Sequence, residues 1–214
     1  MMLKFYMTPG SCSTGIHILL EELELLFEVT ILNLPAGDHH QPCYLVINPK
    51  GTIPALMLPD GHVLTEFQAI AFWLARAYPK AGLLPDDPLK AAMVIELMDY
   101  VVGTVHGQGY TRIFTTEAYL PPGLSGAEQD RWMSAIKDRG QEIVEQAFKV
   151  IEARLPDEGY VAGPRLTLAD AALFYVFFWA DRIGLSMPER CAALYQRIRA
   201  RPIVRQVLKE GGYR

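Results

Sequence analysis

Ser11, Cys12 and Ser13 are three neighbouring residues whose side chains suit chemistry on a sulfur atom. They follow the turn Thr8-Pro9-Gly10 and precede apolar residues at helical spacing, so we expect them at the start of a helix. There the hydroxyl, thiol and backbone N–H groups and the helix dipole all favour an anion. The free thiol of a ligand has a pKa of about 8.5 and is therefore mostly protonated at neutral pH. Lowering that pKa by about two pH units takes roughly 2.7 kcal/mol, which two or three such donors can supply.

Cys12 is the strongest candidate of the three, and the sequence leaves two chemical roles open for it. Its thiol can donate a hydrogen bond to the thiolate of a ligand, or it can form a mixed disulfide with that ligand. The structural alternative is a small buried residue in a tight turn. Tyr6, on the strand ahead of the turn, is expected in the core or on a pocket wall.

A second group of candidate residues lies in the stretch 48–73, NPKGTIPALMLPDGHVLTEFQAIAFW. An Ile53-Pro54 bond can be cis, which would turn the backbone N–H and C=O of Ile53 outward to pair with an extended ligand as a strand edge does. Thr65 has the residue type of a helix N-cap and Gln68 follows at capping-box spacing. The pattern predicts a helix that begins at Glu66.

The start of that helix has groups for both charged ends of an amino acid. If Thr65 caps the N–H of Gln68, the N–H of Phe67 remains free at the positive end of the helix dipole and suits a carboxylate. Glu66 beside it can hold an ammonium group. The alternative for the capping residues alone is an ordinary connection between a hairpin and a helix. Taken together with Ile53, these groups predict a site for a small peptide.

The hydrophobic pattern divides the chain into two parts. Residues 1–79 spell βαβ followed by ββα, with strands expected at 3–7, 28–32, 55–58 and 62–64 and helices after the first turn and from 66 to about 78. Residues 80–88 form a linker rich in proline, and residues 89–214 are expected to be helical throughout.

Four pairs of residues mark helix starts in the second part of the chain. They are Asp87 with Pro88 before a helix that runs to about Phe114, Ser125 with Glu128, Thr167 with Asp170, and Ser186 with Glu189. The third pair precedes AALFYVFFWA, which is apolar on all sides and therefore predicts a buried helix. We interpret Asp170 as a structural residue that satisfies backbone N–H groups, with a catalytic role as the lesser alternative.

Composition narrows the kind of ligand and the compartment. A net charge of −4 and a pI near 5.7 give no reason to expect nucleic acid or an anionic membrane as partner. The cysteines Cys12, Cys43 and Cys191 lie far apart without zinc-ligand spacing, so we expect no metal and a reducing cytoplasm. The longest apolar run, at 171–180, is too short to span a bilayer. A small-molecule ligand fits these features.

Four segments in this order and spacing, FYMTPGSCS, NPKGTIPAL, LTEFQAI and LTLADAAL, resemble the soluble glutathione transferase family, and the first resembles its bacterial beta class. The resemblance covers essentially the whole chain. It implies an α/β plus all-α fold, with a thioredoxin-like βαβ-ββα domain that binds glutathione and an all-helical domain that binds an electrophile. It also implies a cytoplasmic homodimer.

The resemblance assigns expected roles to individual residues. Ile53, with Pro54, would be the backbone partner of the cysteinyl unit of glutathione, Glu66 and Phe67 would hold the γ-glutamyl end, and His106 would face the sulfur. Phe67 stands where many relatives have serine, so only its backbone N–H remains as a donor. The lysine that often binds the glycyl carboxylate in the beta class is absent from its loop, and His39, His40 or Lys50 could replace it, with solvent exposure as the alternative for each.

Further candidates lie in the helical part. His106 can donate to the sulfur or accept a proton during product release, with packing as the alternative. Asp99, two turns earlier on the same face, could reach the ammonium of glutathione in a partner subunit, or could be solvated. Tyr110, Phe114 and Trp179 are expected to wall the electrophile pocket, and the glycine-rich stretch 103–109 should loosen the helix there.

The favoured hypothesis is therefore a glutathione transferase that joins the glutathione thiolate to small apolar electrophiles, a typical detoxification reaction. Glutathione would be the co-substrate. One alternative is a glutathione-dependent disulfide or peroxide reductase that uses Cys12 covalently. Another is a ligand-binding protein without catalytic activity on the same scaffold.

Overall fold

The first part of the chain folds around a four-stranded mixed sheet. In a computed structural model that describes residues 2–213, the strand order is β2-β1-β3-β4. The bounds are β1 (Leu3–Met7), β2 (Phe27–Ile31), β3 (Ala55–Met57) and β4 (Val63–Thr65). Strand β1 pairs in parallel with β2 and antiparallel with β3, which pairs antiparallel with β4. Alternate residues of β1 are buried because their side chains point to the helical face of the sheet.

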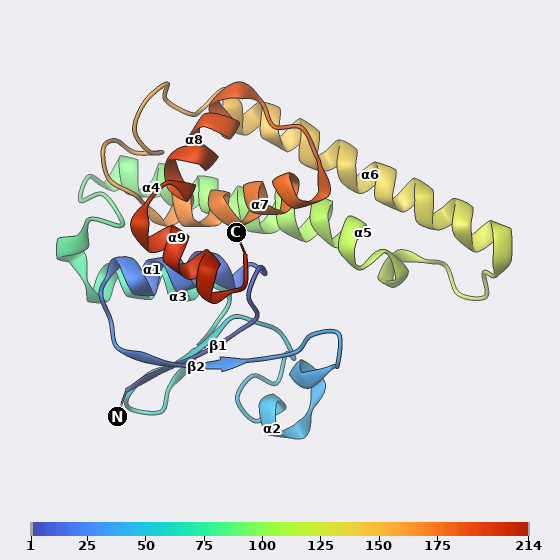
Figure 1. Cartoon of the computed structure of the whole chain (residues 1–214), viewed down its shortest axis with the longest axis horizontal. Helices are drawn as coiled ribbons and strands as arrows, with labels where there is room; N and C mark the ends of the chain where they lie inside the picture. Colours follow the sequence, from blue (N-terminus) through green and yellow to red (C-terminus); the bar gives the residue numbers. More distant parts are fainter. Residues whose placement is uncertain (1, 214) are drawn as a thin grey trace.

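Two longer helices cover one face of this sheet and a short helix lies beyond its end (Figure 1). They are α1 (Ser13–Glu22) and α3 (Phe67–Ala77), and the short one is α2 (Pro42–Leu45). The first eight residues of α1 are all buried, because α1 lies between the sheet and the helices of the second part (Figure 1), where it contacts α7 and α9.

The second part of the chain is helical. Its elements are α4 (Pro88–Tyr100), the π-helical segment η3 (Val101–Tyr110), α5 (Thr111–Phe114), α6 (Gly126–Glu152), α7 (Leu168–Ile183), α8 (Glu189–Arg199) and α9 (Pro202–Glu210). Short 3₁₀ turns are η1 (Asp38–His40), η2 (Pro79–Ala81) and η4 (Thr116–Tyr119). The expected architecture, a mixed α/β unit followed by a helical unit, is confirmed. Within residues 2–213, no helix has both the length and the apolar character needed to cross a membrane.

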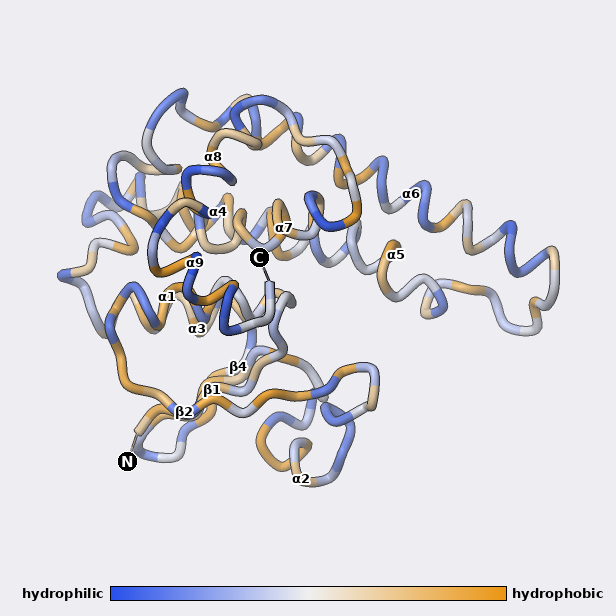
Figure 2. Tube along the Cα trace, in the orientation of Figure 1, coloured by the Kyte–Doolittle hydropathy of each residue, from blue (hydrophilic) through white to orange (hydrophobic). Residues whose placement is uncertain are grey.

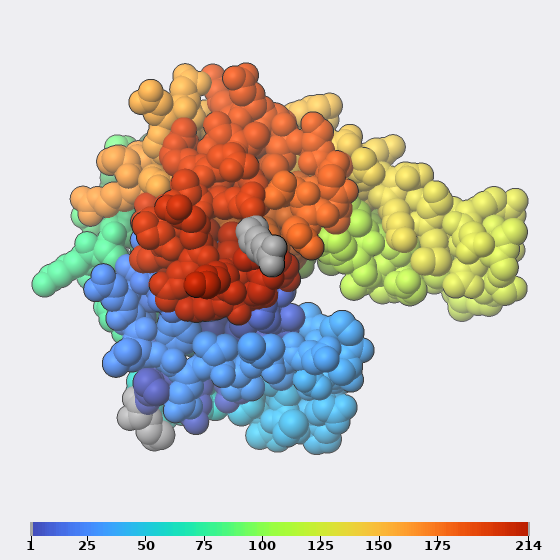
Figure 3. Space-filling model, in the orientation of Figure 1, coloured from blue at the N-terminus to red at the C-terminus, as the bar shows by residue number. Residues whose placement is uncertain are grey.

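Helix α7 is the centre of the core. Every residue from Leu168 to Ala180 is buried, and α7 contacts α1, α4, α8 and η3. Figure 2 shows α7 as a largely hydrophobic segment surrounded by other helices. In contrast, the end of α5, the beginning of α6 and the loop that joins them project from the rest of the molecule (Figure 3). The apolar sequence of α7 therefore predicts its burial correctly.

The capping predictions are confirmed at two helices, where the hydrogen-bond donor and acceptor both lie at the start of the helix. Asp87 accepts a hydrogen bond from the Lys90 amide at 2.8 Å, and the helix that it starts continues to Phe114 as expected. Thr167 and Asp170 form the expected capping box. The Asp170 carboxylate accepts from the Thr167 amide at 2.8 Å and from the Val161 amide at 3.0 Å, so it also fastens the preceding loop. Burial raises the pKa of Asp170 to about 6.

Two other capping predictions were wrong, and a third, at Ser125, was right only about where the helix begins. Thr65 is the last residue of β4, where it pairs with Ala55, and α3 therefore begins one residue later than expected, at Phe67, with no side-chain cap. Ser125 occupies the N-cap position of α6 but its hydroxyl makes no capping bond. Helix α8 takes Pro188 as its N-cap, which leaves Ser186 too early in the chain to cap it.

Candidate active site

The turn between β1 and α1 brings Cys12 against the loop before β3. Cys12 lies immediately before α1 and is 8% exposed, and its Sγ donates to the carbonyl oxygen of Ile53 at 3.7 Å. The Ile53-Pro54 bond is cis, as the sequence allowed. Burial raises the pKa of Cys12 to about 12, although the amides of Ser13 and Cys12 act in the opposite direction. At neutral pH this cysteine is a thiol with a proton to donate.

The two serines beside Cys12 are less free to act on a ligand. The Ser11 hydroxyl donates to the carbonyl oxygen of Thr8 at 2.6 Å and accepts from the Ser13 amide at 3.1 Å, so it closes the turn. The Ser13 hydroxyl is fully buried and has no hydrogen-bond partner in the described part of the chain. Of the three expected donors, only the Cys12 thiol therefore combines an available proton with contact to the Ile53 loop.

The start of α3 presents backbone amides and a strained glutamate. The first amide that bonds back into the helix is that of Ile70, which donates to the Glu66 carbonyl at 3.1 Å, and no side chain caps the amides before it. The N–H groups of residues 67–69 thus remain available to an anion. Glu66 has φ 76° and ψ 133°, which costs a residue other than glycine about 1–3 kcal/mol and is typical of ligand sites.

Lys50 and Phe67 flank this helix start in different ways. The Lys50 ammonium is exposed and forms an ion pair with Glu66. The Phe67 ring points into the protein, is 3% exposed and packs on Tyr175 with ring centroids 5.4 Å apart. The Phe67 side chain therefore packs in the core and provides no hydroxyl for a ligand. Its backbone N–H remains at the start of the helix.

His106, on η3, lies beside two aromatic residues of α7. Its Nδ1 is 3.4 Å from the Tyr175 hydroxyl, and its ring contacts Trp179 at a centroid distance of 4.9 Å. Burial lowers the pKa of His106 to about 4, so the ring is neutral at pH 7. The glycine-rich stretch around it is a π-helix, consistent with the expected loosening.

Tyr175 is the residue at this site that the sequence did not identify. It is fully buried between Phe67 and His106, and a negative charge on Cys12 would raise its pKa further above the value that burial gives it. The one available signal was a hydroxyl inside an otherwise apolar helix, since a buried tyrosine needs a hydrogen-bond partner.

A cavity of about 410 Å³ opens beside the first turn. Its walls include Ser11, Phe114 and Trp179. The Trp179 indole donates to the carbonyl oxygen of Gly10 at 2.7 Å, which fastens the turn to α7. Tyr110, expected on this wall, is instead fully buried behind it: its hydroxyl donates to the Val176 carbonyl at 2.7 Å and its ring stacks on Phe114.

Asp99 is exposed on α4 and makes no ion pair with any of residues 2–213. The rings of His39 and His40 contact each other near Gly51, tilted by 42° with centroids 3.8 Å apart. The structure thus gathers Cys12, Ile53, His106, Phe114 and Trp179 around the turn and the adjoining face of α7. It places Glu66 and Lys50 at the neighbouring helix start.

Comparison with known proteins gives a consistent result. The family profile of the glutathione S-transferase N-terminal domain matches residues 10–77, and that of the C-terminal domain matches residues 134–209. The glutathione S-transferase GstA of Escherichia coli O157:H7 is 34% identical, over 98% of this chain and 99% of its own length.

Solved structures show the same similarity. A glutathione transferase homologue from Sulfitobacter with bound glutathione superposes with a TM-score of 0.86 at 29% identity, covering 98% of each chain. The beta-class enzyme of Sphingomonas chungbukensis superposes with a TM-score of 0.80, also at 29% identity and covering 98% of each chain.

Proposed function

This chain belongs to the glutathione S-transferase family and is an enzyme of that family, and from this premise we propose that it joins the thiolate of glutathione to small apolar electrophiles. The observation that carries the proposal is the Cys12 thiol, which donates to the Ile53 carbonyl beside a cavity walled by Phe114 and Trp179. The thiol can donate a hydrogen bond to the glutathione thiolate, and the apolar cavity can hold the electrophile.

In this proposal glutathione binds along the Ile53 loop and the start of α3. Its cysteinyl unit pairs with the backbone of Ile53, next to Pro54, and its γ-glutamyl carboxylate accepts from the uncapped amide of Phe67. The ligand ammonium replaces Lys50 as the partner of Glu66. Lys50 then becomes available for a carboxylate of glutathione, which supports the role expected for it at the glycyl end.

Cys12 acts as a donor to the glutathione sulfur. When glutathione binds, the Cys12 S–H turns from the Ile53 carbonyl to the thiolate, whose own proton passes to solvent. The thiolate sulfur then attacks the electrophilic carbon, a carbon–sulfur bond forms, and a leaving group departs with its electron pair. A raised pKa suits this role, because a cysteine that stays protonated keeps its hydrogen bond to an anion.

His106 is proposed as a second hydrogen-bond donor, because its lowered pKa makes it a weak base at neutral pH. Tyr175, whose hydroxyl lies 3.4 Å from Nδ1 of His106, helps to orient the ring.

We place the enzyme in the cytoplasm as a homodimer, an assignment supported by three free cysteines and by exposed apolar residues on adjacent helices. Phe72 on α3 is 45% exposed and Met93 on α4 is 49% exposed. In such a dimer Asp99, also on α4, approaches the glutathione of the partner subunit.

The test is glutathione binding by calorimetry, followed by turnover of an aryl halide and of a mixed disulfide by the wild type and Cys12→Ser. We expect Cys12→Ser to retain most aryl-halide conjugation, because a hydroxyl also donates. A loss of disulfide turnover alone would assign an additional covalent role to Cys12. No binding at millimolar glutathione would refute the proposal.

A further inference from the structure

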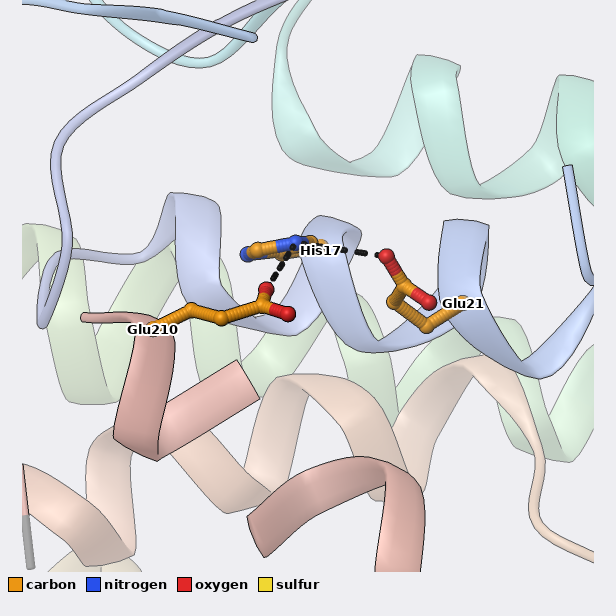
Figure 4. Close-up of side chains that lie close together, drawn as sticks. All are labelled: His17, Glu21 and Glu210. Carbon is orange, nitrogen blue, oxygen red and sulfur yellow. Dashed lines mark ion pairs between the residues drawn. The ribbon is translucent and has the colours of Figure 1, made fainter. Parts of the chain in front are cut away.

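A second cavity, of about 460 Å³, lies between α1, β2 and α9. Three side chains with metal-ligand chemistry stand on its wall and converge on one another (Figure 4). They are His17 and Glu21 on α1 and Glu210 at the end of α9. None of them lines the cavity beside Cys12.

The three ligand atoms lie at nearly the spacing that one ion would require. The Nε2 atom of His17 is 3.7 Å from Glu21 Oε1 and 3.7 Å from Glu210 Oε2, and all three atoms lie within 4.8 Å of one another. Metal bonds of about 2.0–2.2 Å in a tetrahedral site set neighbouring ligand atoms roughly 3.3–3.6 Å apart. Small side-chain rotations close the remaining difference.

The His17 side chain is buried, and its ring makes no hydrogen bond within residues 2–213. It is 7% exposed, and its ring packs against Phe5 and Phe27 at centroid distances of 6.1 and 5.7 Å. Its Nε2 points between the two carboxylates, neither of which is within hydrogen-bond distance. The ring also lines the cavity, so Nε2 is accessible to an ion and to water that enter there.

The carboxylates are also arranged for a cation. The Gln206 amide donates to Oε1 of Glu210 at 2.9 Å, which leaves Oε2 directed at His17. Among residues 2–213, no lysine or arginine forms an ion pair with either Glu21 or Glu210. Burial lowers the pKa of His17, which favours the neutral ring that binds metals, and burial together with the charge of Glu210 raises the pKa of Glu21.

We propose that His17, Glu21 and Glu210 bind a divalent cation of the zinc class, with water from the adjoining cavity in the remaining coordination position. One nitrogen and two carboxylate oxygens suit Zn²⁺, which accepts four mixed ligands, whereas Ca²⁺ requires about six to eight oxygen ligands. Because the ligands come from α1 and α9, the ion links the helix beside the sheet to the last helix of the chain.

The experiment is calorimetric titration of metal-free protein with Zn²⁺ and visible spectroscopy with Co²⁺, in a Cys43→Ser background that removes the exposed thiol. Glu210→Gln and His17→Gln remove one ligand each. Glu24→Gln is the matched control, because it makes the same charge change at an exposed position near the end of α1.

We expect one Zn²⁺ per chain in the background protein and in the Glu24→Gln control, with affinity reduced at least about ten-fold in Glu210→Gln and His17→Gln. Zn²⁺ at about 100 times its Kd should raise the Tm of the background protein by roughly 5–10 °C, an increase that Glu210→Gln should abolish. No saturable binding at millimolar Zn²⁺ would overturn the proposal. Equal affinity in the background protein and Glu210→Gln would also overturn it, because the ion would then lie elsewhere.

Discussion

Replacing Phe67 by serine separates what the sequence suggests at this position from what the structure shows. Sequence resemblance alone implies that Phe67→Ser restores a hydroxyl for the γ-glutamyl carboxylate and improves glutathione binding. In the structure the side chain at this position points inward, where Phe67 packs on Tyr175 and its Cε2 would lie 2.7 Å from a Cβ placed on Gly15. The substitution should therefore act on stability.

The expected loss of stability is large. Truncating a buried phenylalanine costs about 3–5 kcal/mol, and a hydroxyl left in an apolar site without a partner adds about 1–3 kcal/mol. The total is a substantial part of the roughly 5–15 kcal/mol by which a typical domain is stable. Phe67→Leu is the control, because it retains most of the apolar volume and should lose clearly less.

Urea unfolding followed by circular dichroism measures these changes, and calorimetry on protein that remains folded measures glutathione binding. We expect the Kd for glutathione to be nearly unchanged in Phe67→Ser, since the backbone N–H is retained. A stability loss below about 1 kcal/mol would refute the inward packing of Phe67. A ten-fold tighter Kd would show that the hydroxyl reaches the ligand.

Two further predictions concern His106 and the subunit interface. The NMR resonances of the His106 ring should stay at their neutral positions from pH 8 down to about 5, because burial lowers its pKa to about 4. Since the unfolded imidazole has a pKa near 6.5, the unfolded state binds this proton first, and the contribution of His106 to stability should fall as the pH drops from about 6.5 towards 4. A ring that titrates near pH 6.5 would contradict its burial. Phe72→Glu should convert the proposed homodimer to monomer in light scattering, whereas a dimer that persists in the variant would place the interface elsewhere.

The sequence predicted the features that depend on neighbours along the chain. Asp87 and the Thr167–Asp170 pair could be identified because donor and acceptor are three residues apart. The same spacing failed at Thr65 and Ser186, because a capping pattern does not reveal where the preceding strand or loop ends. Local spacing thus gives the kind of element more reliably than its first residue.

Which individual residues meet across the fold could not be predicted from the local sequence pattern. The pattern of α3 does not show that Phe67 faces Tyr175, nor does the pattern of α7 distinguish Tyr175 from its apolar neighbours. The approach of Glu210 to His17 joins opposite ends of the chain and leaves no mark in local periodicity. Such contacts follow only from the way the two parts of the chain pack together.

The most direct test of the central claim, that the Cys12 thiol stabilises the glutathione thiolate, is the pKa of enzyme-bound glutathione. Thiolate absorbance, titrated against pH in the binary complex, gives this value for the wild type and for Cys12→Ala. We expect the bound thiol of the wild type to titrate about two pH units below free glutathione. Loss of one hydrogen bond to a charged sulfur, worth about 1.5–3 kcal/mol, should raise that pKa by about one to two pH units in Cys12→Ala. An identical bound pKa in the two proteins would contradict the claim.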